Sequence, residues 1–382
     1  MSTYKELKGL RVKYVPTDTT SPSTAASGDV WYNTASGQLK GYVGRAAWHS
    51  SADIIVGRYN SGGAGTQTAA FICGGAKNPD AVTDETYEYN GSGWSTGGTM
   101  AGTDRLTTAC GTLTAGLAAG GWSGTANSAD SEEYDGSSWT EGNNLGTAGY
   151  AIGGTGTQTA ALAAGRFSGP PGFPNASEEY DGTNWAEGDN LNTARAAGGM
   201  AGTQTAAALF GGSEGPNFAS GTNGAGEEYN GSSWTETNDM NTARRYLSGI
   251  GTQTAALGIS GYSPGGGNAQ VESYDGSSWT EGPDVLELRR GGGTSGTQTA
   301  ALFFSGDPRS SPNTSVKTES YDGTAWATGP NMATTRRLLT GSPAGTSTSA
   351  LGASGYVTAP VQNTEEFTGE TATDTASTID FD

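Results

Sequence analysis

The residue types that most often perform catalysis are scarce in this chain of 382 residues. It contains one histidine, His49, and two cysteines, Cys73 and Cys110. One imidazole cannot supply a metal site built from several histidines, and neither cysteine has an obvious base to pair with. We therefore expect His49 to be an ordinary strand residue and both cysteines to be small buried side chains. A disulfide between them is allowed but not implied.

Carboxylates are plentiful, but they repeat from one unit of the chain to the next. Aspartate precedes glycine at Asp135, Asp181, Asp275 and Asp322, and asparagine takes this place at 90 and 230. A calcium loop needs several oxygen ligands at alternating positions, so isolated residues of this kind indicate turns and no metal.

Glutamates also occur in repeated pairs, at Glu132-Glu133, Glu178-Glu179 and Glu227-Glu228. An acid/base pair belongs to one unique constellation, so repetition argues against catalysis. Charges along strand edges, which oppose edge-to-edge pairing, are the favoured interpretation. The sequence predicts no enzyme, no catalytic residue and no cofactor.

Two repeated phrases organise the chain. EEYDGSSW occupies 132–139, and it and five variants end in tryptophans spaced 45 to 49 residues apart. A second phrase around GTQTAA occurs seven times, from Gly65 to Gly345. A period of about 40–50 residues built from short strands is typical of a β-propeller with one blade per repeat.

Each repeat predicts four strands, of which the last two form a hairpin closed by Asp-Gly or Asn-Gly. A two-residue turn at Asp135-Gly136 would pair Tyr134 with Ser137 and place Trp139 diagonally beside Tyr134 on one face. We expect one such aromatic pair to pack each blade on its neighbour. The structural blade tryptophans are then Trp48, Trp94, Trp139, Trp185, Trp234, Trp279 and Trp326.

The seventh repeat is incomplete, because NTEEFTGETATD (363–374) has Phe367 in the tyrosine position and no tryptophan five residues later. Trp48 lies one full period before Trp94, so residues at about 45–52 are predicted to supply the missing outer strand and close the ring. The expected fold is an all-β, seven-bladed propeller over 27–369. An N-terminal attachment segment (1–26) and an acidic tail (370–382) lie outside it.

The chain is strongly acidic, with a formal net charge of −19 from 38 acidic and 19 basic residues. Such a surface repels nucleic-acid phosphates and anionic membranes. No apolar run approaches the roughly 20 residues of a membrane span. The start, MSTYKELKGL, lacks the apolar core of a signal peptide. We expect synthesis in the cytoplasm, no nucleic-acid binding and no membrane insertion.

A series of arginines precedes the GT turn by six or seven residues, at Arg58, Arg105, Arg195, Arg244 and Arg289. In a propeller these residues begin the innermost strand, near the mouth of the central channel. One interpretation is that they bridge to acidic groups or carbonyls of a neighbouring blade. The alternative is a ring that captures an anionic ligand.

The loop after each double glycine varies in length and sequence, whereas the two tight turns of each repeat do not. Strand parity places the variable loops on one face of the disc and the tight turns on the other. Loops on a rigid scaffold are where recognition is usually built. The candidate recognition residues on the variable face are Trp122, Phe167, Phe173, Phe218 and Tyr262.

The double glycines, as at Gly74-Gly75, Gly120-Gly121 and Gly211-Gly212, and the following Tyr and Trp resemble those of kelch-type propellers, although the Tyr–Trp spacing is tighter. EEYDGSSW and GTQTAALAAG (156–165) look like the kelch-like repeats of marine bacteriophage virion proteins. SGDVWYNTASGQLKGYVGRAAW (27–48) is similar to the start of phage tail-fibre and appendage proteins.

This resemblance, which covers 27–369, implies a non-enzymatic virion protein. The favoured role is a tail-fibre or appendage adhesin that binds a host surface glycan or protein through its variable loops. The alternatives are a decoration or scaffold protein of the capsid, neck or tail and, less favoured, a glycan-active enzyme. The N-terminal segment would contact other virion proteins. Whether the chain forms a homo-oligomer is left open.

Overall fold

The computed structural model describes residues 46–169, 172–215, 218, 221–264, 266–341 and 345–369, and the backbone of three short strands nearer the N-terminus. The chain divides into two compact units. The first, Met1–Ala47 with Thr368–Asp382, contains β1 (Val12–Lys13), β2 (Val30–Asn33) and β3 (Gln38–Gly41) in one sheet. The second unit, Trp48–Phe367, contains the propeller. Most of the predicted attachment segment and the acidic tail 370–382 lie outside the described residues.

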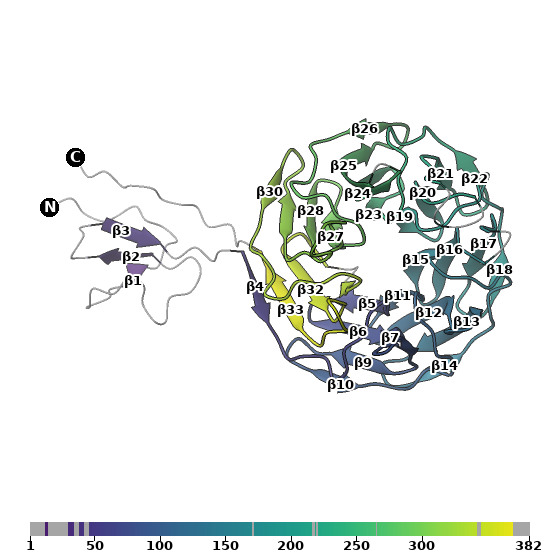
Figure 1. Ribbon diagram of the computed structural model, residues 1–382, viewed down its shortest axis with the longest axis horizontal. Helices are drawn as coiled ribbons and strands as arrows, with labels where there is room; N and C mark the ends of the chain where they lie inside the picture. Colours follow the sequence, from purple (N-terminus) through teal and green to yellow (C-terminus); the bar gives the residue numbers. More distant parts are fainter. Residues whose placement is uncertain are drawn as a thin grey trace. The chain divides into compact units, whose positions relative to one another are not determined.

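Seven four-stranded sheets are arranged around a ring, which confirms the all-β, seven-bladed propeller (Figure 1). Blade 1 has β5 (Gly62–Thr66), β6 (Ala69–Cys73), β9 (Thr86–Tyr89) and β10 (Trp94–Thr96), with β7 (Ala76–Lys77) and β8 (Ala81–Val82) paired in its loop. Blade 2 has β11 (Thr108–Thr112), β12 (Ala115–Trp122), β13 (Asn127–Tyr134) and β14 (Trp139–Glu141). Blade 3 has β15 (Gly153–Thr157), β16 (Ala160–Ala164), β17 (Ser177–Tyr180) and β18 (Trp185–Glu187).

The remaining blades follow the same plan. Blade 4 has β19 (Gly199–Thr203), β20 (Ala206–Phe210), β21 (Gly226–Tyr229) and β22 (Trp234–Glu236). Blade 5 has β23 (Ser248–Thr252), β24 (Ala255–Ser263), β25 (Gly266–Tyr274) and β26 (Trp279–Glu281). Blade 6 has β27 (Gly293–Thr297), β28 (Ala300–Phe304), β29 (Thr318–Tyr321) and β30 (Trp326–Thr328). Blade 7 has β31 (Thr340–Gly341), β32 (Ser349–Ala353), β33 (Thr364–Thr368) and β4 (Ala47–Ser50).

The first strand of each blade is the innermost one, and these strands contact one another around the axis from β5 to β31, which in turn contacts β5. In blade 7 the outer strand β4 precedes blade 1 in the chain, so this sheet joins segments from both ends of the propeller unit. Backbone hydrogen bonds from Ser51 N to Thr364 O (2.9 Å) and from Ile54 N to Gln362 O (2.8 Å) continue this pairing.

The hairpin of the repeated phrase has a longer turn than we expected. Tyr134 lies directly opposite Trp139, so the predicted pairing of Tyr134 with Ser137 is wrong. The Asp135 carboxylate accepts the N–H groups of Ser137 and Ser138, both at 2.8 Å, and thereby holds a four-residue turn. The Tyr134 and Trp139 rings do meet, with centroids 4.8 Å apart.

Side chains of the phrase bond several blades to the preceding one. In blade 3, Trp185 Nε1 donates to Ser131 Oγ of blade 2 at 2.8 Å, and the Tyr180 hydroxyl donates to Glu133 at 2.7 Å. The second glutamate of the pair is therefore an acceptor between blades, not a free charge on a strand edge.

The glutamine of the GTQT turn makes a further connection between blades. Gln158 Nε2 donates to the carbonyls of Gly116 (3.1 Å) and Tyr134 (2.9 Å) in the preceding blade. The same pair of bonds is made by Gln67, Gln204, Gln253 and Gln298. Each bond satisfies a backbone carbonyl that would otherwise face the seam.

Antiparallel pairing assigns the loops to two faces of the disc. Gly62 at the start of β5 lies opposite Cys73 at the end of β6, and Thr66 lies opposite Ala69. The loop entering each inner strand and the variable loop that leaves the second strand therefore share one face. The GTQT turn lies on the other face.

Candidate functional site

Four of the five arginines in the predicted channel-mouth ring are buried inside their blades. These four are Arg58, Arg195, Arg244 and Arg289, and Arg336 occupies the same position in blade 7 and is also fully buried. Each pairs with a glutamate of its own blade, at 2.8 Å in Arg195–Glu227 and 2.5 Å in Arg244–Glu272. These contacts fit the bridging interpretation better than the ligand-capture alternative, but the acidic partner lies in the same blade and not in a neighbouring one.

Blade 5 shows what this pair does. The Glu272 carboxylate accepts the N–H groups of Asn241 (2.6 Å) and Thr242 (3.2 Å) as well as Arg244. Arg244 also donates to the Gly258 carbonyl at 3.1 Å. The first glutamate of the repeated pair therefore anchors the loop that enters the blade, which corrects its interpretation as a strand-edge charge.

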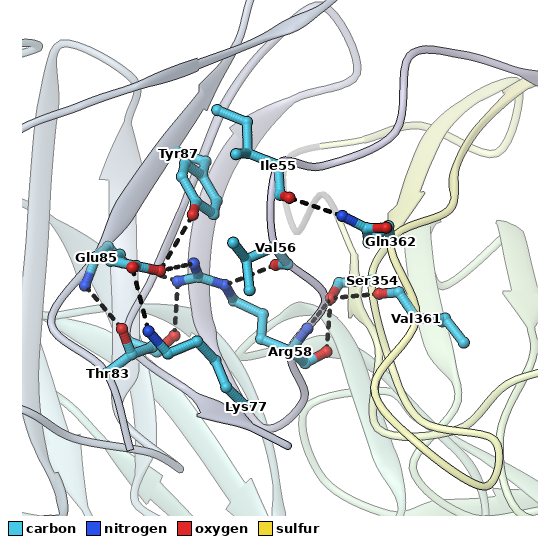
Figure 2. Close-up of polar contacts among 11 residues, drawn as sticks. Ile55, Val56, Arg58, Lys77, Thr83, Glu85, Tyr87, Ser354, Val361 and Gln362 are labelled. Carbon is cyan, nitrogen blue, oxygen red and sulfur yellow. Dashed lines mark hydrogen bonds and ion pairs between the residues drawn. The ribbon is translucent and has the colours of Figure 1, made fainter. Parts of the chain in front are cut away.

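Blade 1 builds the anchor from different residues, and Figure 2 shows the Arg58 guanidinium turned toward Glu85. The closest ion-pair atoms are 2.9 Å apart for Arg58–Glu85 and 3.1 Å apart for Lys77–Glu85. Arg58 N donates to Ser354 Oγ of blade 7 at 2.8 Å. Arg58 thus also links the first and last blades.

Blade 2 has Asp104 in the place of the buried arginine. Glu132 still accepts two loop N–H groups, from Ala101 (2.8 Å) and Gly102 (3.1 Å). Asp104 is 2% exposed, and burial, together with the charges of Asp130 and Glu132, raises its pKa to about 6. The loop is therefore held by the Glu132 carboxylate, with an acid where blades 1 and 4 to 7 have a guanidinium.

In each blade, the residue that directly follows the buried-arginine position belongs to an entrance ring at the mouth of the channel. Its members in blades 1 to 7 are Tyr59, Arg105, Tyr150, Ala196, Arg245, Arg290 and Arg337. Each forms a β-bridge with the first residue of the variable loop, as Arg105 does with Trp122 and Arg290 does with Asp307. Arg105, which we had grouped with the buried arginines, belongs to this entrance ring.

In each blade, the residue that directly follows the entrance-ring residue belongs to a collar around the axis. The collar comprises Asn60, Leu106, Ala151, Ala197, Tyr246, Gly291 and Leu338, all with φ between 53° and 59°. Backbone hydrogen bonds join neighbours, from Leu106 N to Asn60 O (2.8 Å) and from Tyr246 N to Ala197 O (2.9 Å). A left-handed backbone costs a non-glycine residue about 1 kcal/mol or more, and such strain often occurs at ligand sites.

A pocket of about 350 Å³ lies over this collar on the variable-loop face. It is lined by six collar residues and by Tyr150, Phe218, Arg290, Asp307 and Arg337. These residues come from all seven blades, so the pocket is centred on the axis. Its volume is near the lower end of the range of about 300–1,000 Å³ for small-molecule sites.

Beside the pocket lies an aromatic wall, which consists of Trp122, Tyr150, Phe167, Phe173, Phe218 and Tyr246. Of these, Tyr150, Phe218 and Tyr246 line the pocket itself. Neighbouring ring centroids are 5.0 to 6.0 Å apart, and several pairs meet edge to face. Four of the five predicted recognition residues are brought together here. Sequence reasoning missed Tyr150 and Tyr246, although both lie just after the arginine position of their blades.

Three arginines of the entrance ring, Arg245, Arg290 and Arg337, form an arginine cluster with Arg309 from the variable loop of blade 6. Asp307 lies 3.1 Å from Arg290 and 3.6 Å from both Arg309 and Arg337. The ring of Tyr262, the fifth predicted recognition residue, lies beneath this cluster, 5.6 Å from the Arg309 guanidinium carbon. The pocket thus combines positive charge, hydrogen-bond donors and aromatic surface, the features of a binding site for a small ligand.

The remaining predicted chemical groups lie elsewhere. His49 is exposed on β4, and Cys73 and Cys110 are both free thiols whose pKa burial raises to about 12. Within the described ranges, no group of three or more His, Cys, Asp or Glu residues is arranged to hold a metal. The same part of the chain contains no helix long and apolar enough to cross a membrane.

No protein-family model matches this chain, and no curated protein matches it. The likeness to kelch-type and phage repeats therefore depends on the residues quoted for it, and the propeller architecture depends on the structure.

Proposed function

We propose that this chain is a non-enzymatic phage virion protein, an adhesin of a tail fibre or appendage that binds a host surface. The axial pocket carries the proposal, because residues from all seven blades converge on it at the face where the loops vary. The wording of the repeats and the segment 27–48 support a virion origin. The double glycines with the following Tyr and Trp support assignment of the repeats to the kelch-like class.

The difference between the two faces also favours recognition. The tight turns repeat nearly unchanged and bond blade to blade, as Gln158 does, so that face serves the scaffold. The other face has a different loop in each blade, with aromatic residues and arginines around one depression. Residues of the N-terminal unit would attach the propeller to other virion proteins.

Two measurements test the proposal. Immunogold labelling of intact particles is expected to place this chain at fibre tips or at the baseplate. Fluorescently labelled full-length chain is expected to bind saturably to a subset of marine bacterial strains, and Tyr246→Ala is expected to weaken that binding. Thr205→Ala, an exposed change on the uniform face, is the control that leaves binding unchanged.

Label over the head or neck, combined with no saturable binding to a susceptible strain, would overturn the adhesin proposal. The variable loops would then be contacts of a decoration or scaffold protein. Shortening of host polysaccharide during incubation would instead identify an enzyme.

A further inference from the structure

We infer that the axial pocket binds a carboxylate-bearing sugar of a host surface glycan, such as a uronic acid residue. The carboxylate would lie against Arg290 and Arg337, and the ring of the sugar against the aromatic wall. This inference rests on the proposed function and names the chemical class of its ligand.

The first argument is the excess of positive charge in the arginine cluster. Asp307 has a side chain that is 3% exposed, and three guanidinium groups from Arg290, Arg309 and Arg337 surround it. One carboxylate balances one of these charges, which leaves two without a counter-ion among the residues that the structure describes. An incoming carboxylate would supply the missing negative charge.

The buried arginines show that this imbalance is particular to the pocket. Arg244 has Glu272 at 2.5 Å and a carbonyl at 3.1 Å, and its side chain is fully buried. Arg290 and Arg337 are 26% and 23% exposed and line the pocket. Because the chain has a net charge of −19, an exposed positive site on it is a local exception. A concave, partly desolvated site concentrates its field and favours anions.

The second argument is the aromatic surface beside this charge. Tyr150, Phe218 and Tyr246 line the same pocket as Arg290 and Arg337. Their rings are held by edge-to-face and tilted contacts with other members of the wall, so little side-chain freedom remains to be lost on binding. The C–H face of a sugar ring packs on such a surface while its carboxylate reaches the guanidinium groups.

The third argument favours a sugar over an acidic peptide. Extended peptides usually bind by pairing their backbone with free N–H and C=O groups of a strand edge. Here Tyr150 N donates to Phe167 O at 3.1 Å and Arg290 N donates to Asp307 O at 3.0 Å. Collar N–H groups such as those of Leu106 and Tyr246 donate to the collar carbonyl of the preceding blade. Recognition at this mouth therefore depends on side chains, and a pocket of about 350 Å³ suits a compact terminal group.

The test is calorimetric titration of the full chain with four probes. These are a galacturonic acid trimer, a neutral galactose trimer, a sulfated galactose trimer and a glutamate tripeptide. We expect tightest binding to the galacturonic acid trimer and weaker binding as salt concentration rises. Arg290→Gln and Arg337→Gln are each expected to weaken that binding by about tenfold. Lys317→Gln removes the same charge at an exposed position outside the pocket lining and is expected to leave binding unchanged.

Several outcomes would overturn the inference. These are tighter binding of the sulfated, neutral or peptide probe, and unchanged affinity in folded Arg290→Gln and Arg337→Gln variants. Failure of every probe, while the chain still binds host cells, would reject the acidic-sugar class and leave the adhesin function intact. Failure of cell binding alone would reject the adhesin function, because the titration does not use cells.

Discussion

Blades 2 and 5 are entered through equivalent loops, yet the buried residue next to the loop has opposite charge in the two blades, Asp104 in blade 2 and Arg244 in blade 5. In blade 5, Arg244 neutralises Glu272, and the carboxylate also binds two loop N–H groups. In blade 2, Asp104 takes the arginine position, and Glu132 keeps its two N–H bonds. The comparison teaches that the loop conformation depends first on the carboxylate, and that the arginine is needed to balance its charge.

Blade 3 supports this division of roles. It has Gly149 at the arginine position, and Arg166, from the end of its second strand, places a guanidinium 2.8 Å from Glu178. Two different chain positions therefore supply the same cation to the same acceptor. The buried glutamate is therefore paired with a guanidinium in both blades, although the arginine comes from different positions of the repeat.

The largest expected effect is loss of the cation in blade 5. Arg244→Met leaves Glu272 buried with no counter-ion, so we expect the free energy of unfolding to fall by about 3–5 kcal/mol. Equilibrium denaturation in urea measures this change. The double variant Arg244→Met with Glu272→Gln is the control and should recover part of the loss. A loss under about 1 kcal/mol for the single variant would contradict the charge-balance argument.

The second prediction concerns the acid in blade 2. The pKa of Asp104 is about 6 in the folded chain, above its ordinary value of 3.8, so the folded state binds the proton more tightly. Stability from this group is present below about pH 4 and is lost as pH rises through 6. We expect Asp104→Asn to stabilise the protein by about 2 kcal/mol near pH 8 and to have little effect near pH 4.

Denaturation midpoints across this pH range check the Asp104 prediction. Asp130 and Glu132 face the same site and add to the effect, and a hydrogen bond with Ser128 opposes it. Asp181→Asn, at an exposed turn whose carboxylate accepts backbone N–H groups, is the control and should not stabilise at high pH. An Asp104→Asn effect independent of pH would refute the assignment.

The smallest prediction compares equivalent tryptophans of the two blades. Trp139 Nε1 of blade 2 donates to Thr86 Oγ1 at 2.7 Å, whereas Trp279 Nε1 of blade 5 is buried without a partner in the described structure. The preceding blade has Gly226 where a hydroxyl would be needed. Trp139→Phe should therefore cost about 1 kcal/mol more than Trp279→Phe in thermal or urea unfolding. Equal costs would show that this bond contributes nothing net.

The blade count could be predicted because period and turn chemistry are local signals, repeated seven times. The hairpin register was missed because the Asp135 side chain, not the Asp-Gly pair alone, sets the turn length. The pairing of the buried arginines with glutamates of their own blades was missed for another reason. Glu272 is far from Arg244 in sequence, so spacing to the GT turn does not reveal the buried pair.

Part of the candidate site, its loop aromatic residues, could be predicted from the sequence. Aromatic residues in variable loops are conspicuous, and Trp122, Phe167, Phe173 and Phe218 do assemble in one wall. In the entrance ring only Tyr59 shares the residue type of Tyr150, and no other collar residue is aromatic like Tyr246, so no repeat signal marked either tyrosine. The one-residue offset of Arg105 from the other arginines was the available sign of a second ring.

The collar has a consequence for how this protein can change over generations. Its backbone is held in place by the neighbouring blades, while six of its seven residues line the floor of a shared pocket. Substitutions at Leu106, Ala151 or Leu338 alter that floor without touching the bonds that join the blades. Under the proposed function, the collar would be a combinatorial surface, on which small independent changes in different repeats alter ligand preference while the disc itself stays the same.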